Sequence, residues 1–121
     1  MRSLLPLAAV LAFTSSIVAD EIGTWPTAEI CRAGAEAYFF LDGSPVHRGY
    51  NGWHQLQSLS GNAYRCQVAA GGHLRFSWKR DDGVDMNSQS ATFTVDGDQL
   101  VVVTDMMTVT FEKTDTGYQR I

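Results

Sequence analysis

The chain has 121 residues, thirteen of them acidic and nine basic, which gives a formal net charge of −4. This length suits one domain with one hydrophobic core and is too short for two domains of ordinary size. The acidic balance argues against nucleic acids and anionic membrane surfaces as partners, because both reward clustered Lys and Arg.

The first nineteen residues have the layout of a secretory signal peptide. Arg2 precedes an apolar run over residues 4–13, and small residues lead up to Ala19. This order predicts cleavage after Ala19. A membrane-spanning helix needs about 20 consecutive apolar residues, and Thr14–Ser16 interrupts the run before that length. We therefore predict a periplasmic or secreted protein with a single domain over residues 20–121 and no membrane association after cleavage. Eight basic and thirteen acidic residues would then remain, a net charge of −5.

A helix is predicted near the start of this domain, after a turn at Trp25-Pro26. Residues 28–38 place apolar side chains at helical spacing, and we expect Thr27 to cap the helix. Glu29 in the first turn suits the positive end of the helix dipole.

The chain has two cysteines, Cys31 in the predicted helix and Cys66 in the predicted sheet. An oxidising compartment would pair them, because each is the only partner available to the other. A metal pair or a redox couple is the alternative, but the wide spacing without a CxxC motif supports neither. A closed loop of roughly 35 residues stabilises a fold by about 4 kcal/mol in the chain-entropy model.

From Trp53 onward the hydrophobic period changes from about 3.6 to 2, and turn residues recur every ten positions or so. The predicted strands cover residues 53–58, 63–69, 73–79, 91–95, 100–104, 107–113 and 118–121. Alternation predicts that one face of the sheet is core. Residues 100–103 are apolar on both faces, which predicts a central strand. The predicted fold class is α+β, with an N-terminal helix disulfide-linked to an antiparallel β-meander sheet.

No catalytic, cofactor or metal motif stands out, and we expect a protein that is not an enzyme. There is no GxSxG sequence, and the cysteines are consumed by each other. The histidines, His47, His54 and His73, are scattered. Residues 81–87 offer several oxygen ligands for calcium, but their spacing differs from an EF-hand loop and no closing glutamate follows. A solvated hairpin loop is the preferred interpretation of that segment.

The segment from His47 to His54 has the densest mixture of residue types that are common at binding sites. Its glycines flank an aromatic side chain, an amide side chain and an arginine. Tyr, Trp and Arg are over-represented at binding hot spots, and loops held by a rigid sheet often carry binding function. The alternative is that Tyr50 and Trp53 pack over the helix end while Asn51-Gly52 makes a turn. The candidate binding residues are Arg48, Tyr50, Asn51 and Trp53 in this loop, with Trp78 and Arg80 as a second, weaker edge.

Four pieces of the chain resemble a group of small exported bacterial proteins. The pieces are Cys31-Arg32-Ala33, Tyr64-Arg65-Cys66, Trp78 and residues 93–100, which match C-[KR]-A, Y-[KR]-C, a following Trp and F-x-V-x-G-D-x-L. The likeness covers about residues 31 to 112. Gly34 and a longer stretch between Cys66 and Trp78 depart from the pattern. The group has no assigned activity, so the resemblance implies no functional residues.

A second, fainter similarity is to the periplasmic inhibitors of C-type lysozyme. Residues 60–64 look like their SGxxY segment, and Trp78-Lys79-Arg80 looks like their W-x-K. The spacing between the two pieces differs, and the predicted helix is foreign to that family. We expect an exported, non-enzymatic binding protein that recognises another protein in the cell envelope, inhibitor-like or immunity-like. The first alternative is a module that binds a small ligand or an envelope polymer. The second, less favoured alternative is a small hydrolase.

Overall fold

The structure is a computed structural model that describes residues 21–40, 46–48 (backbone only), 52–58 and 61–121. The predicted signal segment and its cleavage point lie outside these residues. The helix is α2 (Thr27–Phe39). The strands are β1 (Glu21–Ile22), β2 (Trp25–Pro26), β3 (Val46–Arg48), β4 (His54–Gln57), β5 (Ala63–Ala69), β6 (His73–Lys79), β7 (Asp85–Asp96), β8 (Gln99–Val103), β9 (Thr108–Thr114) and β10 (Gly117–Arg120).

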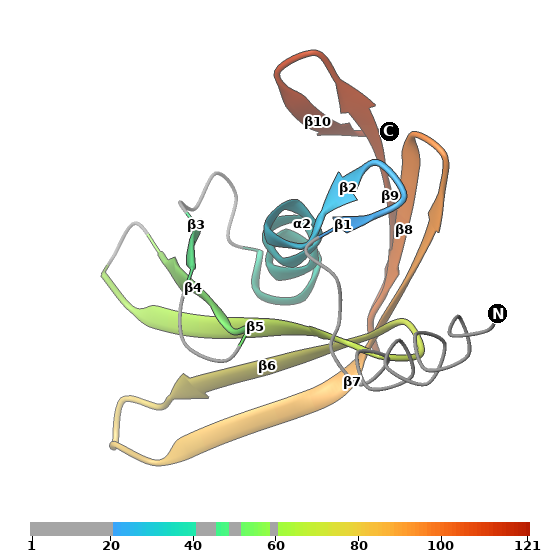
Figure 1. Ribbon diagram of the computed structural model, residues 1–121. Coiled ribbons are helices and arrows are strands. Elements are labelled where there is room, and N and C mark those ends of the chain that lie inside the picture. Colours follow the sequence, from blue (N-terminus) through green and yellow to red (C-terminus); the bar gives the residue numbers. More distant parts are fainter. Residues whose placement is uncertain (1–20, 41–45, 49–51, 59–60) are drawn as a thin grey trace, which may run out of the picture.

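Eight of the strands form one antiparallel sheet in the order β10-β9-β8-β7-β6-β5-β4-β3. This is the strand order of the predicted meander, but the sheet is not a simple meander. It curls into a half-barrel around α2, with β3–β6 along one side of the helix and β8–β10 along the other (Figure 1). The strong right-handed twist of antiparallel strands and a bulge between Leu74 and Phe76 help the sheet to curl.

The long strand β7 joins the two sides of the half-barrel. Its first part, Asp85–Ser88, pairs with the end of β6, whereas Thr92–Asp96 pairs with β8. The sequence predicted only residues 91–95 as strand and assigned the polar segment before them to a loop. That segment lacks an apolar alternation, and its strand conformation comes from the hydrogen bonds that β6 supplies.

Two further local predictions are wrong. Trp25-Pro26 is not a turn but strand β2, which pairs with β1. Thr27 does not cap the helix: Pro26 occupies the N-cap position, and the Thr27 hydroxyl lies 3.2 Å from Nε2 of the buried His54. The Thr27 hydroxyl, which the sequence predicted to cap the helix, therefore contacts a residue far away in the chain. Within the described residues, no helix is long and apolar enough to cross a bilayer.

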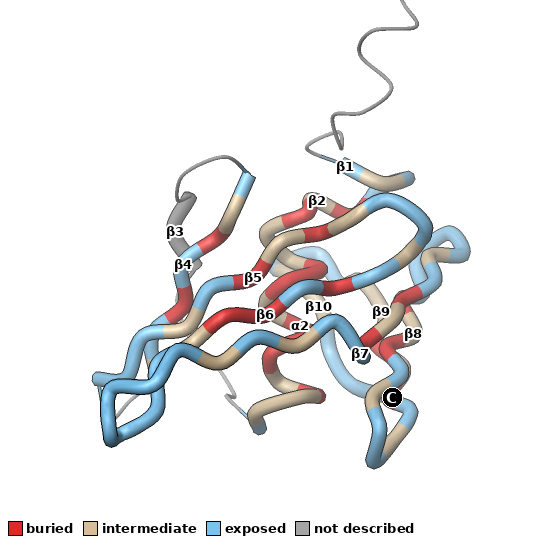
Figure 2. Tube along the Cα trace, turned by 90° about the horizontal axis from the view of Figure 1, so that it is seen from below, coloured by how far each residue is buried: buried red, intermediate tan, exposed pale blue. Residues whose placement is uncertain are grey.

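The core lies between α2 and the concave face of the sheet. Along β5 and β6 the more buried and the more exposed residues alternate, as the sequence predicted (Figure 2). Ser77 is the exception, because it is buried on the predicted solvent face of β6. The strand β8 is central, but only Leu100 and Val102 are buried, and Val103 on the opposite face is 41% exposed. Gly34 is buried in the helix face toward β6, where an added Cβ would lie 2.5 Å from Leu74 Cδ1. The absence of a side chain at this position thus permits close approach of helix and sheet.

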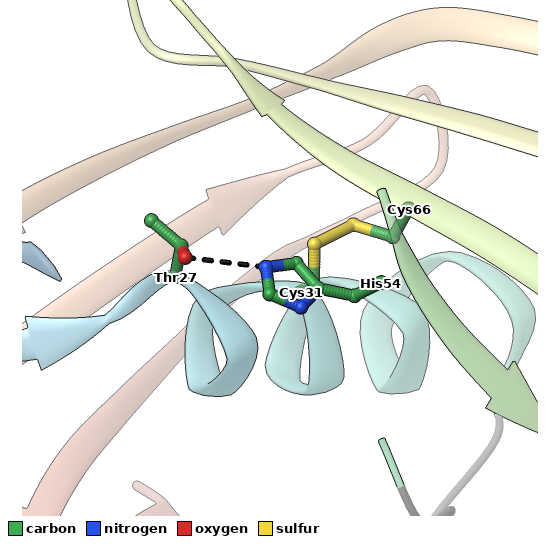
Figure 3. The surroundings of a disulfide bond; sticks show 4 residues. All are labelled: Thr27, Cys31, His54 and Cys66. Atoms are coloured by element: carbon green, nitrogen blue, oxygen red, sulfur yellow. Dashed lines mark hydrogen bonds between the residues drawn. A yellow bond between two sulfur atoms is a disulfide. The ribbon is translucent and has the colours of Figure 1, made fainter. Parts of the chain in front are cut away.

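The predicted disulfide is confirmed. Cys31 on α2 is bonded to Cys66 on β5, with their Cα atoms 5.8 Å apart, and neither side chain reaches solvent. His54 lies opposite Cys66 on the neighbouring strand, and its ring extends beside the bridge toward Thr27 (Figure 3). The bridge and the Thr27–His54 contact together attach the N-terminal half of the helix to β4 and β5.

Candidate binding surface

The outer face of β4–β6 carries a group of polar side chains around two arginines. Because Cys66 and Phe76 point inward to the core, the period of two places Arg65 and Arg75 on the opposite, convex face. In the strand register, Gln55, Arg65 and Ser77 stand in one row across the three strands, and Gln67 stands opposite Arg75. We call Trp53, Arg65, Gln67, Arg75 and Ser77 the arginine face.

Two contacts hold the guanidinium of Arg65. Its Nη2 donates a hydrogen bond to Oγ of Ser77 at 3.2 Å, and its Cζ lies 5.2 Å from the centre of the Trp53 ring. Ser77 is 8% exposed, so the hydroxyl is a firm anchor. A guanidinium over an aromatic face gains cation–π attraction and keeps most of its N–H donors free. Arg65 is therefore positioned while remaining exposed.

Arg75 is held in a similar way by a neutral partner. Its Nη1 donates to Oε1 of Gln67 at 3.4 Å. Neither Arg75 nor Arg65 forms an ion pair within the part of the chain that the structure describes. Lys79, further along the same face, differs, because its Nζ lies 3.0 Å from Oδ1 of Asp85. Two guanidinium groups, each oriented by a neutral partner and without an ion pair among the described residues, thus stand on one exposed face.

This surface coincides with a charge asymmetry along the chain. Residues 43–80 contain no Asp or Glu but hold five of the nine Lys and Arg residues and every histidine, whereas residues 81–121 hold eight acidic and two basic residues. The net charge of the whole chain therefore does not describe this face. Reasoning from the sequence missed Arg65 and Arg75, and the stretch without carboxylates is the signal that could have found them.

The structure places the predicted loop residues only in part. Tyr50 and Asn51 lie outside the described residues, and of Arg48 only the backbone is described, paired with His54 across β3 and β4. Trp53 is half-buried and contacts Arg65. Of the loop candidates, Trp53 is thus the one that the structure brings into the arginine face.

The second predicted edge is divided between two environments. Trp78 is on the inner face of β6, where its ring lies 4.9 Å from that of Phe39 and 6.2 Å from that of Tyr38, centre to centre. Arg80 is exposed in the turn after β6 and forms an ion pair with Asp82. Trp78 therefore closes the core at the C-terminal end of the helix, and it does not share a surface with Arg80 or with Arg65.

In and around the acidic turn after β6, charged side chains pair with one another. The guanidinium of Arg80 holds the pKa of the Asp82 carboxyl below its ordinary value, and Asp82 also accepts a hydrogen bond from the Val84 backbone. Asp85 pairs with Lys79 at the start of β7. Across the residues described, no three His, Cys, Asp or Glu side chains gather closely enough to hold a metal ion. Weak or absent calcium binding stays a prediction.

A groove of about 470 Å³ lies between the end of α2 and β10, lined by Glu36, Phe40, Tyr118, Gln119 and Arg120. The Tyr118 hydroxyl donates to Oε1 of Glu36 at 3.1 Å. Burial raises the pKa of Tyr118 above its ordinary value, and the Glu36 carboxylate raises it further. Tyr118 consequently keeps its proton near neutral pH and acts as a donor to Glu36. The two groups converge, as an acid–base pair would, but Tyr118 is not tuned to act as a base.

Comparisons with protein-family profiles, with curated protein sequences and with solved structures return no match for this chain.

Proposed function

We propose that this is an exported, non-enzymatic binding protein that recognises another protein in the cell envelope, as an inhibitor or an immunity protein does. The binding surface is the arginine face on β4–β6. One observation carries the proposal: Arg65 and Arg75 are exposed on β5 and β6, Trp53 is half-exposed directly before β4, and each of the three contacts a neighbouring side chain. Trp and Arg are the residue types that dominate binding energy at protein interfaces.

The surrounding scaffold supports this function. The disulfide attaches β5, which carries Arg65, to the helix, and β5 is paired with β6, which carries Arg75. Preorganised side chains lose less conformational entropy on binding, which favours affinity. The disulfide and the signal-like N-terminal segment both support an export route to the periplasm or the cell exterior.

The test uses three variants without a change of charge, Trp53→Ala and two truncated glutamines on opposite sides of the half-barrel. Gln55→Ala truncates a side chain in the row of Arg65, and Gln99→Ala truncates a glutamine on β8 that is also exposed. We expect a partner captured from envelope extract by the wild-type protein to be lost with Trp53→Ala, weakened by Gln55→Ala and retained by Gln99→Ala. A true hot spot costs at least about 2 kcal/mol, roughly thirtyfold in affinity. Retention by all three variants, each folded by circular dichroism, would place the binding face elsewhere.

The groove beside β10 favours a second candidate function, the binding of a small ligand. Its volume falls in the range of ligand sites, and Phe40, 63% exposed, offers an aromatic surface beside Glu36 and Arg120. Phe40 also holds a left-handed backbone conformation (φ 60°) that is uncommon for a bulky residue. Screening polar metabolites and envelope saccharides by ligand-observed NMR, with Phe40→Ala as the control, tests this alternative.

A further inference from the structure

We propose that Arg65 and Arg75 form a twin-guanidinium site that receives carboxylates from an acidic segment of the partner protein. This inference rests on the proposed function and names the chemistry of the partner. A guanidinium matches a carboxylate through two parallel N–H···O bonds, which Lys cannot reproduce.

The first argument is that both arginines are oriented without being neutralised. Ser77 and Gln67 each accept one hydrogen bond, and the Trp53 ring supports Arg65 from one side. These contacts with neutral groups orient the two guanidinium groups. They leave most of the N–H donors and the whole positive charge available to a partner. In the same protein, the exposed Lys79 is paired with a carboxylate. Among the described residues, the arginine face thus lacks a counter-charge, although the chain has thirteen acidic residues.

The second argument is the cost of this arrangement in the isolated protein. Arg75 is opposite Gln67, two residues from Arg65, so the arginines are diagonal neighbours across β5 and β6. The Cα atoms of diagonal neighbours lie roughly 7–8 Å apart, and like charges carried by residues this close disfavour each other, weakly where solvent screens them. An anionic partner removes this repulsion and adds charge-assisted hydrogen bonds. The same contact therefore favours binding in two ways, by relieving the repulsion and by forming hydrogen bonds.

The third argument concerns the source of the carboxylates. Nucleic acids and anionic bilayers reward many clustered cations, and they repel the acidic residues on the rest of this molecule. Residues 81–121 hold eight acidic side chains against two basic ones. A short acidic stretch of a folded protein brings fewer negative charges near these carboxylates than a long polyanion does. The charge distribution therefore favours a protein segment over a long polyanion.

The experiment titrates the disulfide-bonded protein with a synthetic peptide of alternating glutamate and glycine. NMR follows the side-chain N–H signals of Arg65, Arg75 and Trp53. We expect saturable shifts of these signals and affinity that falls as salt rises. Arg65→Gln and Arg75→Gln should each weaken binding roughly tenfold or more, because hydrogen bonds between charged groups are lost. Lys79→Gln removes the same charge from the same face and should weaken binding by less than about threefold, because Lys79 is already paired.

Two further arms separate the competing explanations. Arg65→Lys keeps the charge and should still lose most of the affinity, since the planar fork is gone. Inorganic phosphate and phosphatidylglycerol vesicles should bind more weakly than the peptide. Tighter binding of either, equal losses in the Gln variants of Lys79 and the arginines, or no saturable binding would each overturn the proposal. A natural partner that needs Trp53 but tolerates Arg75→Gln would overturn this inference and leave the proposed function standing.

Discussion

The two sides of the half-barrel hold the same helix by different means. On the β4–β5 side the attachment is a disulfide and a contact between Thr27 and His54. On the β9–β10 side it is polar and charged: Lys113 Nζ lies 2.8 Å from Oε1 of Glu29, and the Tyr118 hydroxyl donates to Glu36. One side is attached by a covalent bond and the other by electrostatic contacts.

The two sides also differ in where their cations point. Lys113 on the β9–β10 side contacts a helix carboxylate. Arg65 and Arg75 on the other side point away from the helix, because strand alternation places them on the convex face. They contact the neutral side chains of Ser77 and Gln67 instead.

The largest effect is expected from breaking the covalent side. Replacing both Cys31 and Cys66 by Ser should lower the free energy of unfolding by about 4 kcal/mol in the chain-entropy model. For a domain of this size that corresponds to a fall in Tm of roughly 15–30 °C. Calorimetry of the double variant and of the reduced wild-type protein should agree. A loss below about 1 kcal/mol would mean that the noncovalent contacts of β4 and β5 suffice.

A smaller loss is expected where helix and sheet approach most closely. In Gly34→Ala the new Cβ would meet Leu74 Cδ1 at 2.5 Å, and Leu74 is fully buried. Overpacking costs about 1–3 kcal/mol, which exceeds the helix propensity of up to about 1 kcal/mol that alanine adds. Denaturant unfolding should show a net loss. In a Leu74→Ala background, which makes room, the same change should be neutral or stabilising, and an undiminished loss there would refute this explanation.

A smaller loss of stability is expected from breaking the ion pair on the β9–β10 side, and this loss should depend on salt. Lys113→Met leaves Glu29 without its cation, in a pair whose side chains are 22% and 29% exposed. We expect a loss of about 1 kcal/mol, discounted for solvent screening. A double-mutant cycle with Glu29→Gln isolates the pair, and its coupling should shrink as salt is raised. A coupling energy of zero would assign the attachment to Tyr118 and the packing of Trp25.

The smallest effect on stability at neutral pH is expected from changing Tyr118, and this effect increases as the pH rises. Burial and Glu36 raise the folded-state pKa of Tyr118 above the ordinary 10.0, so the folded state holds its proton more tightly than the unfolded state. The resulting stability is complete below pH 10 and declines as the pH rises from there toward the folded-state pKa. Tyr118→Phe should flatten this alkaline decline in Tm. An equally steep decline in the variant would locate the titrating group elsewhere.

Local signals predicted the fold wherever they were strong. The bounds of β5 and β6 were predicted residue for residue, because both strands alternate and are flanked by glycine turns. The first part of β7 and the short β3 were missed, since their pairing partners, and not their own residue pattern, make them strands. The predicted binding loop included Trp53. It did not include Arg65 and Arg75, because outward residues of a half-buried strand carry no local mark of function.

By itself, the sequence determined what depends on neighbours along the chain or on unique pairing. It determined the helix, most strands, the single possible disulfide and the carboxylate-free stretch over residues 43–80. Only the tertiary structure decided the curl of the sheet, the diversion of the Thr27 hydroxyl to His54 and the meeting of Trp53, Arg65 and Arg75 on one face. These features depend on strand register and on the approach of helix and sheet, which arise from contacts between residues far apart in the chain.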